Sequence, residues 1–325
     1  MKVLFICSGN NVSGINPIIS RQANSLIKKG IEVDFFKIEG KGVTGYLKAI
    51  PRLKSYLNLN KYDVLHAHYA LCGYVAYFGS VKQKRVLSFM GSDLLSSIPR
   101  SSGTGFLVKF LNRINIIMAK LFFDKVILKS EEMMKVFGDS SGKILIPNGV
   151  DFDVFKMEDK ATAMRELKIS QDRHHIIFVS NPSRPEKNFA LAEKTLCLLD
   201  RSKYELHVVY NCDTRKLVKY YNAADVLLMT SFYEGSPNVI KEAMACNCPV
   251  VTTNVGDVSL LLGSVNGCFV TDFNPENIKD CLIKAVDFRE KNRFTNGVEK
   301  LRRLELSSDA IADKLIELYK SLSRV

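Results

Sequence analysis

Two glutamates, eight positions apart, flank an expected helix start. The stretch SFYEGSPNVIKEAMACNCPVV, residues 231–251, contains Glu234 and Glu242 with a Gly-Ser-Pro turn between them. Serine is a preferred helix cap and proline is favoured at the first helical position. We therefore expect Ser236 to cap a helix whose first residue is Pro237, with Glu234 in the preceding loop and Glu242 inside the helix.

This arrangement fits a nucleoside diphosphate lying along the helix. The N–H groups at the amino end of a helix bind phosphate oxygens. A helix rises about 1.5 Å per residue, so Glu242 would lie abreast of a ribose and accept its hydroxyls. Glu234 could accept hydroxyls of the group that the diphosphate carries. The spacing alone leaves a second interpretation open, in which Glu234 is a capping residue and Glu242 is solvated.

Strand-like and helix-like segments alternate along the whole chain. The apolar runs are VLFIC, IEVDFFKI, DVLHAHY, RVLSFMG, KVILKS and KILIPNGVD, and then HIIFVS, YELHVVY, ADVLLMT and PVVTT. Such alternation predicts parallel sheets with helices on both faces. We predict an α/β fold of two Rossmann-like doubly wound domains, residues 1–155 and 156–305, joined by the turn-rich linker PNGVDFDVFKMEDK. A C-terminal helix over 306–325 is expected to pack back towards the first domain.

Composition and cysteine usage narrow the class of protein. The chain has 325 residues, 46% hydrophobic and 25% charged, which is typical of a soluble globular protein. The opening apolar run is too short for a signal peptide or a membrane span, so we expect a cytoplasmic protein. The eight cysteines form no C-x-x-C pair and no His/Cys group at metal spacing. We therefore expect reduced cysteines and no metal site.

The positive charge is concentrated in the first half of the chain. Of the formal net charge of +12, +11 lies in residues 1–165. A basic half indicates a partner with phosphates, such as nucleic acid, anionic lipid headgroups or a phosphorylated substrate. The sequence has no helix-turn-helix, RNA-binding signature or aromatic-basic interleaving. Nucleic acid is thus not an expected partner, although a basic nucleic-acid-binding protein stays a minor alternative.

The block EGSPNVIKEAMACNCPVV resembles the E-x7-E motif of the retaining glycosyltransferases of family 4. Further matching segments follow in the family's order: the Ser13-Gly14 loop, DVLHAHY, FMGSDLL, KVILKSEEM, IPNGVDFDVF, RPEKN and YYNAADVLLMTS. The resemblance implies the GT-B arrangement, in which two Rossmann-like domains face a cleft with the donor on the second and the acceptor on the first. The chain departs from the family at Asn247, where glycine is usual, but asparagine also tolerates a left-handed helix cap.

The resemblance also implies roles for particular residues. It implies catalytic roles for His68, Glu234, Arg184 and Lys187. The implied donor-binding residues are Gly14, Arg184, Lys187, Glu234, Gly235, Ser236, Pro237, Asn238, Val239 and Glu242. On the acceptor side it points to Ser13, His66 and Asp93. From the residues themselves, Arg184 and Lys187 could equally be solvated surface, His66 a core histidine and Asp93 a helix cap.

Sugar transfer from a nucleoside diphosphate leaves negative charge on the diphosphate, which needs fixed positive groups. In the family Arg184 and Lys187 would supply them in place of a metal, so we expect no cofactor and no metal. No residue stands out as a nucleophile, which fits a front-face substitution assisted by the leaving diphosphate. The expected partners are a nucleotide-sugar donor and a glycan or lipid-linked acceptor, as in surface polysaccharide or glycolipid biosynthesis. A nucleotide-sugar epimerase or hydrolase is the main alternative.

Asp151-Phe152-Asp153 has the D-x-D pattern by which other glycosyltransferases bind metal. It follows PNGV in the linker, and we interpret it as a turn.

Residues 103–125, GTGFLVKFLNRINIIMAKLFFDK, predict an amphipathic helix. Its apolar positions 107, 110, 111, 114, 117, 118 and 121 recur at helical spacing among Lys109, Arg113, Lys120 and Lys125. Such a face either packs on the domain's own sheet or docks, with the basic half, on an anionic membrane. Lys48, Arg52 and Lys54 would add to the same surface if they lie nearby.

Overall fold

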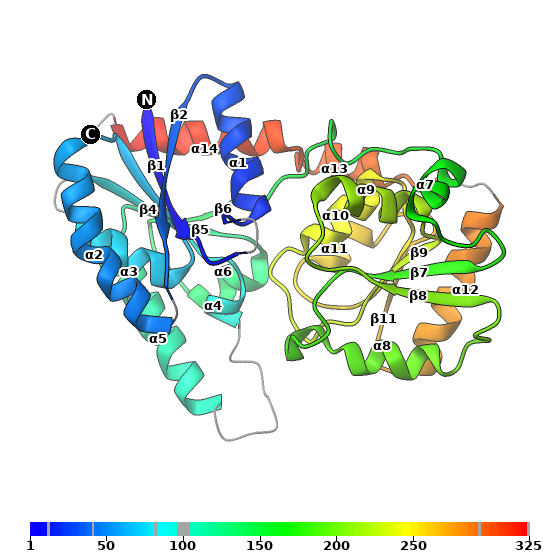
Figure 1. Cartoon of the computed structure of the whole chain (residues 1–325). Coiled ribbons are helices and arrows are strands. Elements are labelled where there is room, and N and C mark those ends of the chain that lie inside the picture. The colour runs from blue at the N-terminus through cyan, green and yellow to red at the C-terminus, as the bar shows by residue number, and fades with distance from the viewer. Residues whose placement is uncertain (12–13, 41, 81–82, 96–104, 292–293, 324–325) are drawn as a thin grey trace. The chain divides into compact units, whose positions relative to one another are not determined.

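The computed structural model divides the chain into two compact units, whose elements can be followed in Figure 1. It describes residues 1–11, 14–40, 42–80, 83–95, 105–291 and 294–323. Unit 1 comprises Met1–Gly149 and Ser308–Val325, and unit 2 comprises Val150–Ser307. The chain passes from one unit to the other after Gly149 and again after Ser307. The sequence analysis places these two boundaries after residues 155 and 305.

Unit 1 contains, within its described residues, a six-stranded parallel sheet in the order β2-β1-β3-β4-β5-β6. Its strands are β1 (Lys2–Ser8), β2 (Glu32–Ile38), β3 (Val64–His68), β4 (Lys84–Ser88), β5 (Lys125–Leu128) and β6 (Lys143–Leu145). Its helices are α1 (Pro17–Lys28), α2 (Gly42–Leu59), α3 (Ala70–Gly79), α4 (Ser92–Leu95), α5 (Gly105–Phe122), α6 (Glu131–Phe137) and α14 (Ser308–Ser323). The topological switch point lies between β1 and β3, because the chain builds the sheet outwards from β1 in both directions.

Unit 2 contains, over the part of the chain that is described, a five-stranded parallel sheet in the order β11-β10-β9-β7-β8. Its strands are β7 (His174–Phe178), β8 (Tyr204–Val208), β9 (Val226–Met229), β10 (Val250–Thr253) and β11 (Phe269–Thr271). Its helices are α7 (Lys160–Leu167), the 3₁₀ helix η1 (Pro185–Lys187), α8 (Phe189–Leu196), α9 (Thr214–Ala223), α10 (Asn238–Ala245), α11 (Val258–Leu262), α12 (Pro275–Glu290) and α13 (Gly297–Arg303). Here the switch point lies between β7 and β9.

The predicted fold of two doubly wound parallel sheets is confirmed. Each apolar run named in the sequence analysis contributes a strand. The edge strand β11 was not predicted, since it is only three residues long and half-buried. Short, half-exposed edge strands lack the apolar run that marks a central parallel strand.

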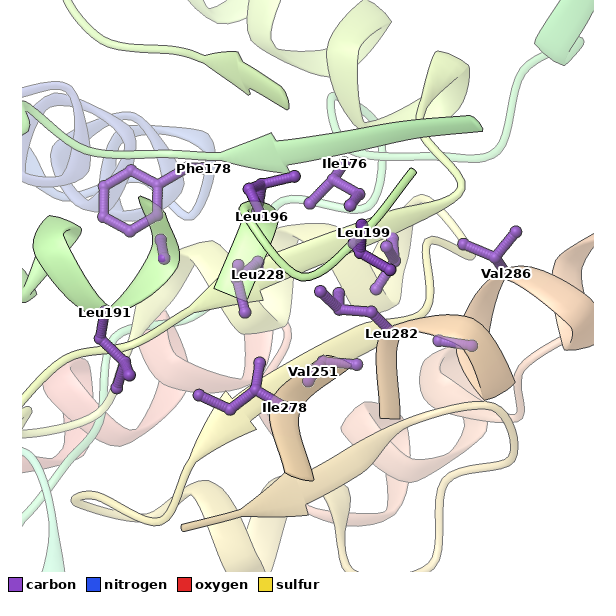
Figure 2. Packing of buried hydrophobic residues seen from close by; sticks show 13 residues of the cluster. Ile176, Phe178, Leu191, Leu196, Leu199, Leu228, Val251, Ile278, Leu282 and Val286 are labelled. Atoms are coloured by element: carbon purple, nitrogen blue, oxygen red, sulfur yellow. The ribbon is translucent and has the colours of Figure 1, made fainter. Parts of the chain in front are cut away.

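One face of the unit 2 sheet is covered by α8 and α12, as Figure 2 shows. Ile176 and Phe178 of β7 are two apart and therefore point to the same face. Ile278, Leu282 and Val286 of α12 recur every four residues and form the buried stripe of that helix. This apolar layer holds β7, β9 and β10 in place, and the loops at their carboxyl ends depend on it.

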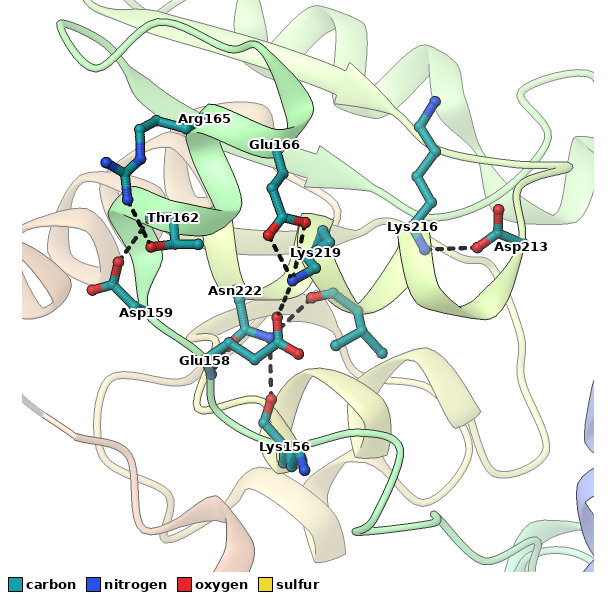
Figure 3. Close-up of polar contacts among 11 residues, drawn as sticks. Lys156, Glu158, Asp159, Thr162, Arg165, Glu166, Asp213, Lys216, Lys219 and Asn222 are labelled. Atoms are coloured by element: carbon teal, nitrogen blue, oxygen red, sulfur yellow. Dashed lines mark hydrogen bonds and ion pairs between the residues drawn. The ribbon is translucent and has the colours of Figure 1, made fainter.

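The predicted linker is anchored to unit 2 from Val150 onwards. Buried Asn222 of α9 accepts a 2.6 Å hydrogen bond from the Glu158 N–H and donates one of 3.1 Å to the Lys156 carbonyl (Figure 3). Lys219 forms ion pairs with Glu158 at 2.9 Å and with Glu166 at 3.1 Å. The polar, turn-rich composition of this segment predicted a linker between the domains. These tertiary contacts instead make the segment from Val150 onwards part of unit 2.

Candidate active site

Three loops of unit 2 follow the neighbouring strands β7, β9 and β10. They span residues 179–188, 230–237 and 254–257. Because the sheet is parallel, the carboxyl ends of these strands lie at one edge, on both sides of the switch point. Open α/β sheets bind their ligands at that position.

Lys187 and Glu234 form an ion pair that joins the first two of these loops. The ammonium donates to Glu234 Oε1, and Ser231 Oγ donates to the same oxygen at 2.8 Å. Both charged side chains are 15% exposed. Thr230 Oγ1 also donates to the carbonyls of Lys187, at 3.1 Å, and Asn188, at 2.9 Å. The pair therefore sits in a braced, partly buried position.

Arg184 lies in the same loop as Lys187 but is directed elsewhere. Its Nε donates to Glu186 Oε1 at 2.8 Å, and its side chain is 52% exposed. The described contacts therefore bring together two of the three predicted charged residues and leave Arg184 paired with its neighbour.

The helix after β9 begins one residue later than predicted. The first residue of α10 is Asn238, and Pro237 occupies the N-cap position with no capping side chain. The prediction that Ser236 caps the helix and that Pro237 is its first residue is therefore wrong. Proline has no N–H, so the first-turn N–H groups begin at Asn238 and Val239, both of which are half-buried.

Glu242 is buried inside α10 and is held by a tyrosine. Its exposed fraction is 6%, and Tyr221 Oη donates to Glu242 Oε2 at 3.0 Å. Burial, reinforced by the charge of Glu242, raises the pKa of Tyr221 far above its ordinary value, so its hydroxyl remains a donor. The interpretation of Glu242 as a solvated residue is wrong.

The two histidines of β3 lie at the switch point of unit 1 and have different surroundings. Hydrogen bonds join His66 Nδ1 to Tyr319 Oη at 2.6 Å and His66 Nε2 to Ser88 Oγ at 2.8 Å. The His68 ring stacks on His66 with centroids 4.2 Å apart, and its buried Nε2 has no hydrogen-bond partner among the described residues. Burial, together with the charge of Lys129, lowers the pKa of His68 to about 3. His66 is thus a fully bonded core histidine, whereas neutral His68 retains an unused nitrogen.

Asp93 organises the chain beside these histidines. Its Oδ1 accepts from the N–H groups of Met90, at 2.9 Å, and Gly91, at 3.0 Å, while its Oδ2 accepts from Ala70 at 2.9 Å. Asp93 therefore caps α3 from a different segment of the chain. Burial raises its pKa to about 6 against these backbone donors. Tyr69, which precedes α3, has φ 91° and ψ 143°, a region that is essentially restricted to glycine.

Gly14 lies in the segment after β1. Its N–H donates to the Asn11 carbonyl at 2.8 Å, and its φ of 79° favours glycine. Ser13, the predicted acceptor-side neighbour, lies outside the described residues.

Two groups bear on the predicted absence of a metal. Asp151 Oδ1 accepts from the Asp153 N–H at 2.9 Å, as expected for a turn. Elsewhere in the described chain, His175, Glu205 and His207 lie close enough to hold an ion. His175 Nδ1 and His207 Nε2 are hydrogen-bonded to each other at 2.8 Å, so each imidazole already has a partner. The absence of a metal stays a prediction.

Two models of known protein families match this chain. Residues 159–287 match the family model for glycosyl transferases group 1, and residues 11–123 match that for glycosyl transferase 4-like proteins. Both matched segments therefore belong to glycosyltransferase families.

Relatives of this glycosyltransferase are distant in sequence. It is 23% identical to a D-inositol 3-phosphate glycosyltransferase of Streptosporangium roseum, over 72% of this chain and 63% of the relative. It is 21% identical to the UDP-Gal:alpha-D-GlcNAc-diphosphoundecaprenol alpha-1,3-galactosyltransferase of Escherichia coli, over 83% and 80%. The chain thus spans less than two thirds of the length of the first of these relatives.

The fold of this glycosyltransferase matches that of GT-B enzymes. Anabaena Alr3699/HepE, solved in complex with UDP and glucose, aligns with a TM-score of 0.77 at 16% identity, covering 99% of this chain and all of that one. No helix in the described part of the glycosyltransferase is both long and apolar enough to cross a membrane.

Two residues beside the loops after β9 and β10 were missed by sequence reasoning. Lys241 is completely buried in α10, and burial lowers its pKa to about 8 against the charges of Asp257 and Glu242. Gly256 brings the loop after β10 against the Glu234 and Gly235 carbonyls. A glycine after the strand PVVTT was a usable turn signal. A buried lysine gives no such signal, because lysine is mostly exposed.

Proposed function

We propose that this protein is a retaining, metal-independent glycosyltransferase. It moves a sugar from a nucleoside-diphosphate sugar to a hydroxyl of a glycan or lipid-linked acceptor, in the biosynthesis of a surface polysaccharide or glycolipid. The observation that carries the proposal is the Lys187–Glu234 pair at the switch point of unit 2, braced by Thr230 and Ser231. The solved complex of Alr3699/HepE with UDP and glucose supports a nucleotide-sugar donor.

Positive groups stabilise the leaving diphosphate. The Lys187 ammonium has three donors, so it can hold Glu234 and also donate to a phosphate oxygen. The first-turn N–H groups of α10, at Asn238 and Val239, bind further phosphate oxygens. The Arg184 side chain is half-exposed, so its guanidinium can turn from Glu186 to a phosphate. These groups do the work that a divalent metal does elsewhere.

Carboxylates orient the rest of the donor. Glu234 accepts hydroxyls of the transferring sugar, and Glu242, held by Tyr221, accepts those of the ribose. His68 supplies a neutral imidazole from unit 1 for contact with the sugar. In the transfer, the bond from the anomeric carbon to the diphosphate oxygen breaks while a bond to the acceptor oxygen forms on the same face. The acceptor's proton passes to the leaving diphosphate.

A panel of nucleotide-sugars tests this function. The full chain is incubated with each UDP- and GDP-sugar, with and without an acceptor lipid extract, while free nucleotide and sugar products are followed. Acceptor-dependent release of UDP or GDP, with retained anomeric configuration in the product, is expected. Release that needs no acceptor would instead indicate a hydrolase, and an altered sugar still attached to its nucleotide would indicate an epimerase. We place the reaction in the cytoplasm, at the membrane surface.

A further inference from the structure

Unit 1 contains an apolar cavity of about 490 Å³ among α2, α3, α4 and α5. This size falls within the range of ligand pockets, which is about 300–1,000 Å³. Most of its wall comes from apolar side chains of α2, α3 and α5, including Leu47, Ile50, Leu71, Phe78 and Leu111. Cavities lined in this way take apolar ligands and hold water poorly.

One end of the cavity is polar. Asp93 and Ser92 line it there together with Asn112 and Asn115. The amides are engaged: Asn112 donates to the Leu94 carbonyl at 3.0 Å, and Asn115 donates to the Asp93 carbonyl at 3.3 Å. Tyr69, the residue directly after His68, also lines the cavity. The cavity therefore reaches the residue next to the histidine that we assign to the sugar.

The outer face of α5 is apolar and exposed. Phe110, Ile114, Ile117 and Leu121 follow one another at helical spacing, with exposed fractions of 53%, 36%, 50% and 68%. Val43 and Leu47 of α2 and Phe78 of α3 are each about 60% exposed as well. Of the predicted stripe, Met118 is buried at 5% exposure and the side chain of Leu107 lies outside the described residues. For the other positions of the stripe, the alternative of burial on the unit's own sheet is wrong. Exposed apolar patches of this kind mark interaction surfaces.

The helices that form this face carry charges of one sign. The segments that form α2, α3 and α5 contain no aspartate or glutamate. α2 contributes Lys48, Arg52 and Lys54, and α5 contributes Lys109, Arg113 and Lys120, all of which are exposed. Because basic residues are attracted to the negative surface of an anionic membrane, such a face is complementary to anionic lipid headgroups.

We propose that the acceptor is a membrane lipid, whose hydrocarbon chain enters this cavity while the exposed faces of α2 and α5 rest on an anionic bilayer. The proposal rests on the proposed function, because it names the acceptor class of that reaction. The cavity holds the chain, its polar end holds the headgroup beside Tyr69, and the basic residues hold the enzyme at the headgroup layer.

The first experiment measures binding of a hydrocarbon chain. Dansylaminoundecanoic acid is titrated into the full chain and its fluorescence is followed. The double variant Leu47→Asn/Leu111→Asn should weaken the affinity for the probe about tenfold or more, because it makes the cavity wall polar. Both leucines are half-exposed, so the fold should tolerate the change, and urea unfolding verifies this. The control is Leu260→Asn, an equally exposed leucine in unit 2. Equal affinity in the double variant and the wild type would overturn the proposal.

The second experiment measures docking and transfer. Flotation with phosphatidylcholine vesicles should show binding that rises with phosphatidylglycerol content and falls at high salt. Arg52→Ala/Lys109→Ala/Arg113→Ala should reduce it, whereas Lys284→Ala in unit 2 should not. Sugar transfer is measured with a labelled nucleotide-sugar and vesicles of acceptor lipid extract, by counting the labelled lipid in the organic phase. The leucine double variant should form less labelled lipid than the wild type.

Binding of the nucleotide-sugar itself separates the two proposals. It is measured without vesicles and should be the same in the wild type and in both variants. Vesicle binding that does not change with anionic lipid content or salt would overturn the proposal of a lipid acceptor, as would sugar transfer only to soluble glycans. Neither result would contradict the proposed glycosyltransferase function. If the wild-type chain binds no nucleotide-sugar, the proposed function itself is contradicted.

Discussion

Lys187 and Glu234 are 47 positions apart in the chain and form an ion pair at the edge of one sheet. The lysine ends the 3₁₀ helix after β7, and the glutamate lies in the loop after β9. β7 and β9 are neighbours with the switch point between them, so the strand order itself brings the two charges together. We infer that the carboxylate holds the ammonium in position for the diphosphate.

Lys187→Ala should slow sugar transfer by about 10²- to 10³-fold, since it removes one fixed positive group from the leaving diphosphate. Steady-state kinetics with the best nucleotide-sugar of the panel provide the measurement. Lys194→Ala, an exposed lysine of α8, is the matched control and should behave like the wild type. Unchanged kcat and KM in Lys187→Ala would remove the lysine from the mechanism.

Glu242→Ala should weaken donor binding chiefly through the ribose hydroxyls. Tyr221→Phe should have a smaller effect of the same kind, because the carboxylate stays and only its 3.0 Å partner is lost. Calorimetric titration with UDP or GDP, compared with the corresponding 2′-deoxynucleotide, checks both variants. If Glu242→Ala weakened binding of both nucleotides equally, the ribose assignment would be wrong.

Transfer should persist in excess EDTA, because Arg184, Lys187 and the start of α10 supply the positive groups. The assay is the nucleotide-release measurement with and without chelator. Complete loss of activity that Mn²⁺ restores would contradict the prediction. Variants of Asp151 and of His207 would then distinguish the two candidate ligand groups.

Gly256→Ala should lower both stability and transfer. A Cβ at this position would lie 2.4 Å from the Gly235 carbonyl oxygen and 2.7 Å from that of Glu234, so the Glu234 loop must shift. Gly30→Ala is a matched control, because Gly30 also has a positive φ but would place its Cβ in open space. We expect Gly30→Ala to cost only the backbone strain of about 1 kcal/mol and to keep activity. Equal effects of the two variants in urea unfolding and in kinetics would contradict this.

The stability of unit 1 should fall in acid because of His68. Its folded-state pKa of about 3 lies below the ordinary value of 6.5, so between these pH values the unfolded chain binds a proton that the folded chain does not. The free energy of unfolding therefore falls as the pH decreases from about 6.5 to 3, by up to about 1.4 kcal/mol per pH unit for this histidine. His68→Phe should reduce the slope, measured by urea unfolding at several pH values. An unchanged slope would mean that His68 is not the group responsible.

The residues that form the strands could be read from the sequence, because a strand covered on both faces is a continuous apolar run. Asn247 was expected to tolerate a left-handed cap, and its φ of 58° confirms this. Glu234 and Lys187 were singled out by the resemblance of their segments to a family motif, and their roles stay predictions. For the strands and for the Asn247 cap, the deciding physics is local and lies within a few residues.

Other features depended on contacts between distant segments. Tyr319 of α14 and Ser88 of β4 form hydrogen bonds with both ring nitrogens of His66, while His68 keeps a nitrogen without a partner among the described residues. The local sequence His-Ala-His does not show which histidine is fully bonded. The periodicity of α5 predicted an apolar face but not whether that face is covered. Asp93 has a helix-capping role, but it caps α3 rather than its own helix. Periodicity and cap preference act within one element, whereas strand order, burial and hydrogen-bond partners arise only when the elements pack, so tertiary structure alone decided them.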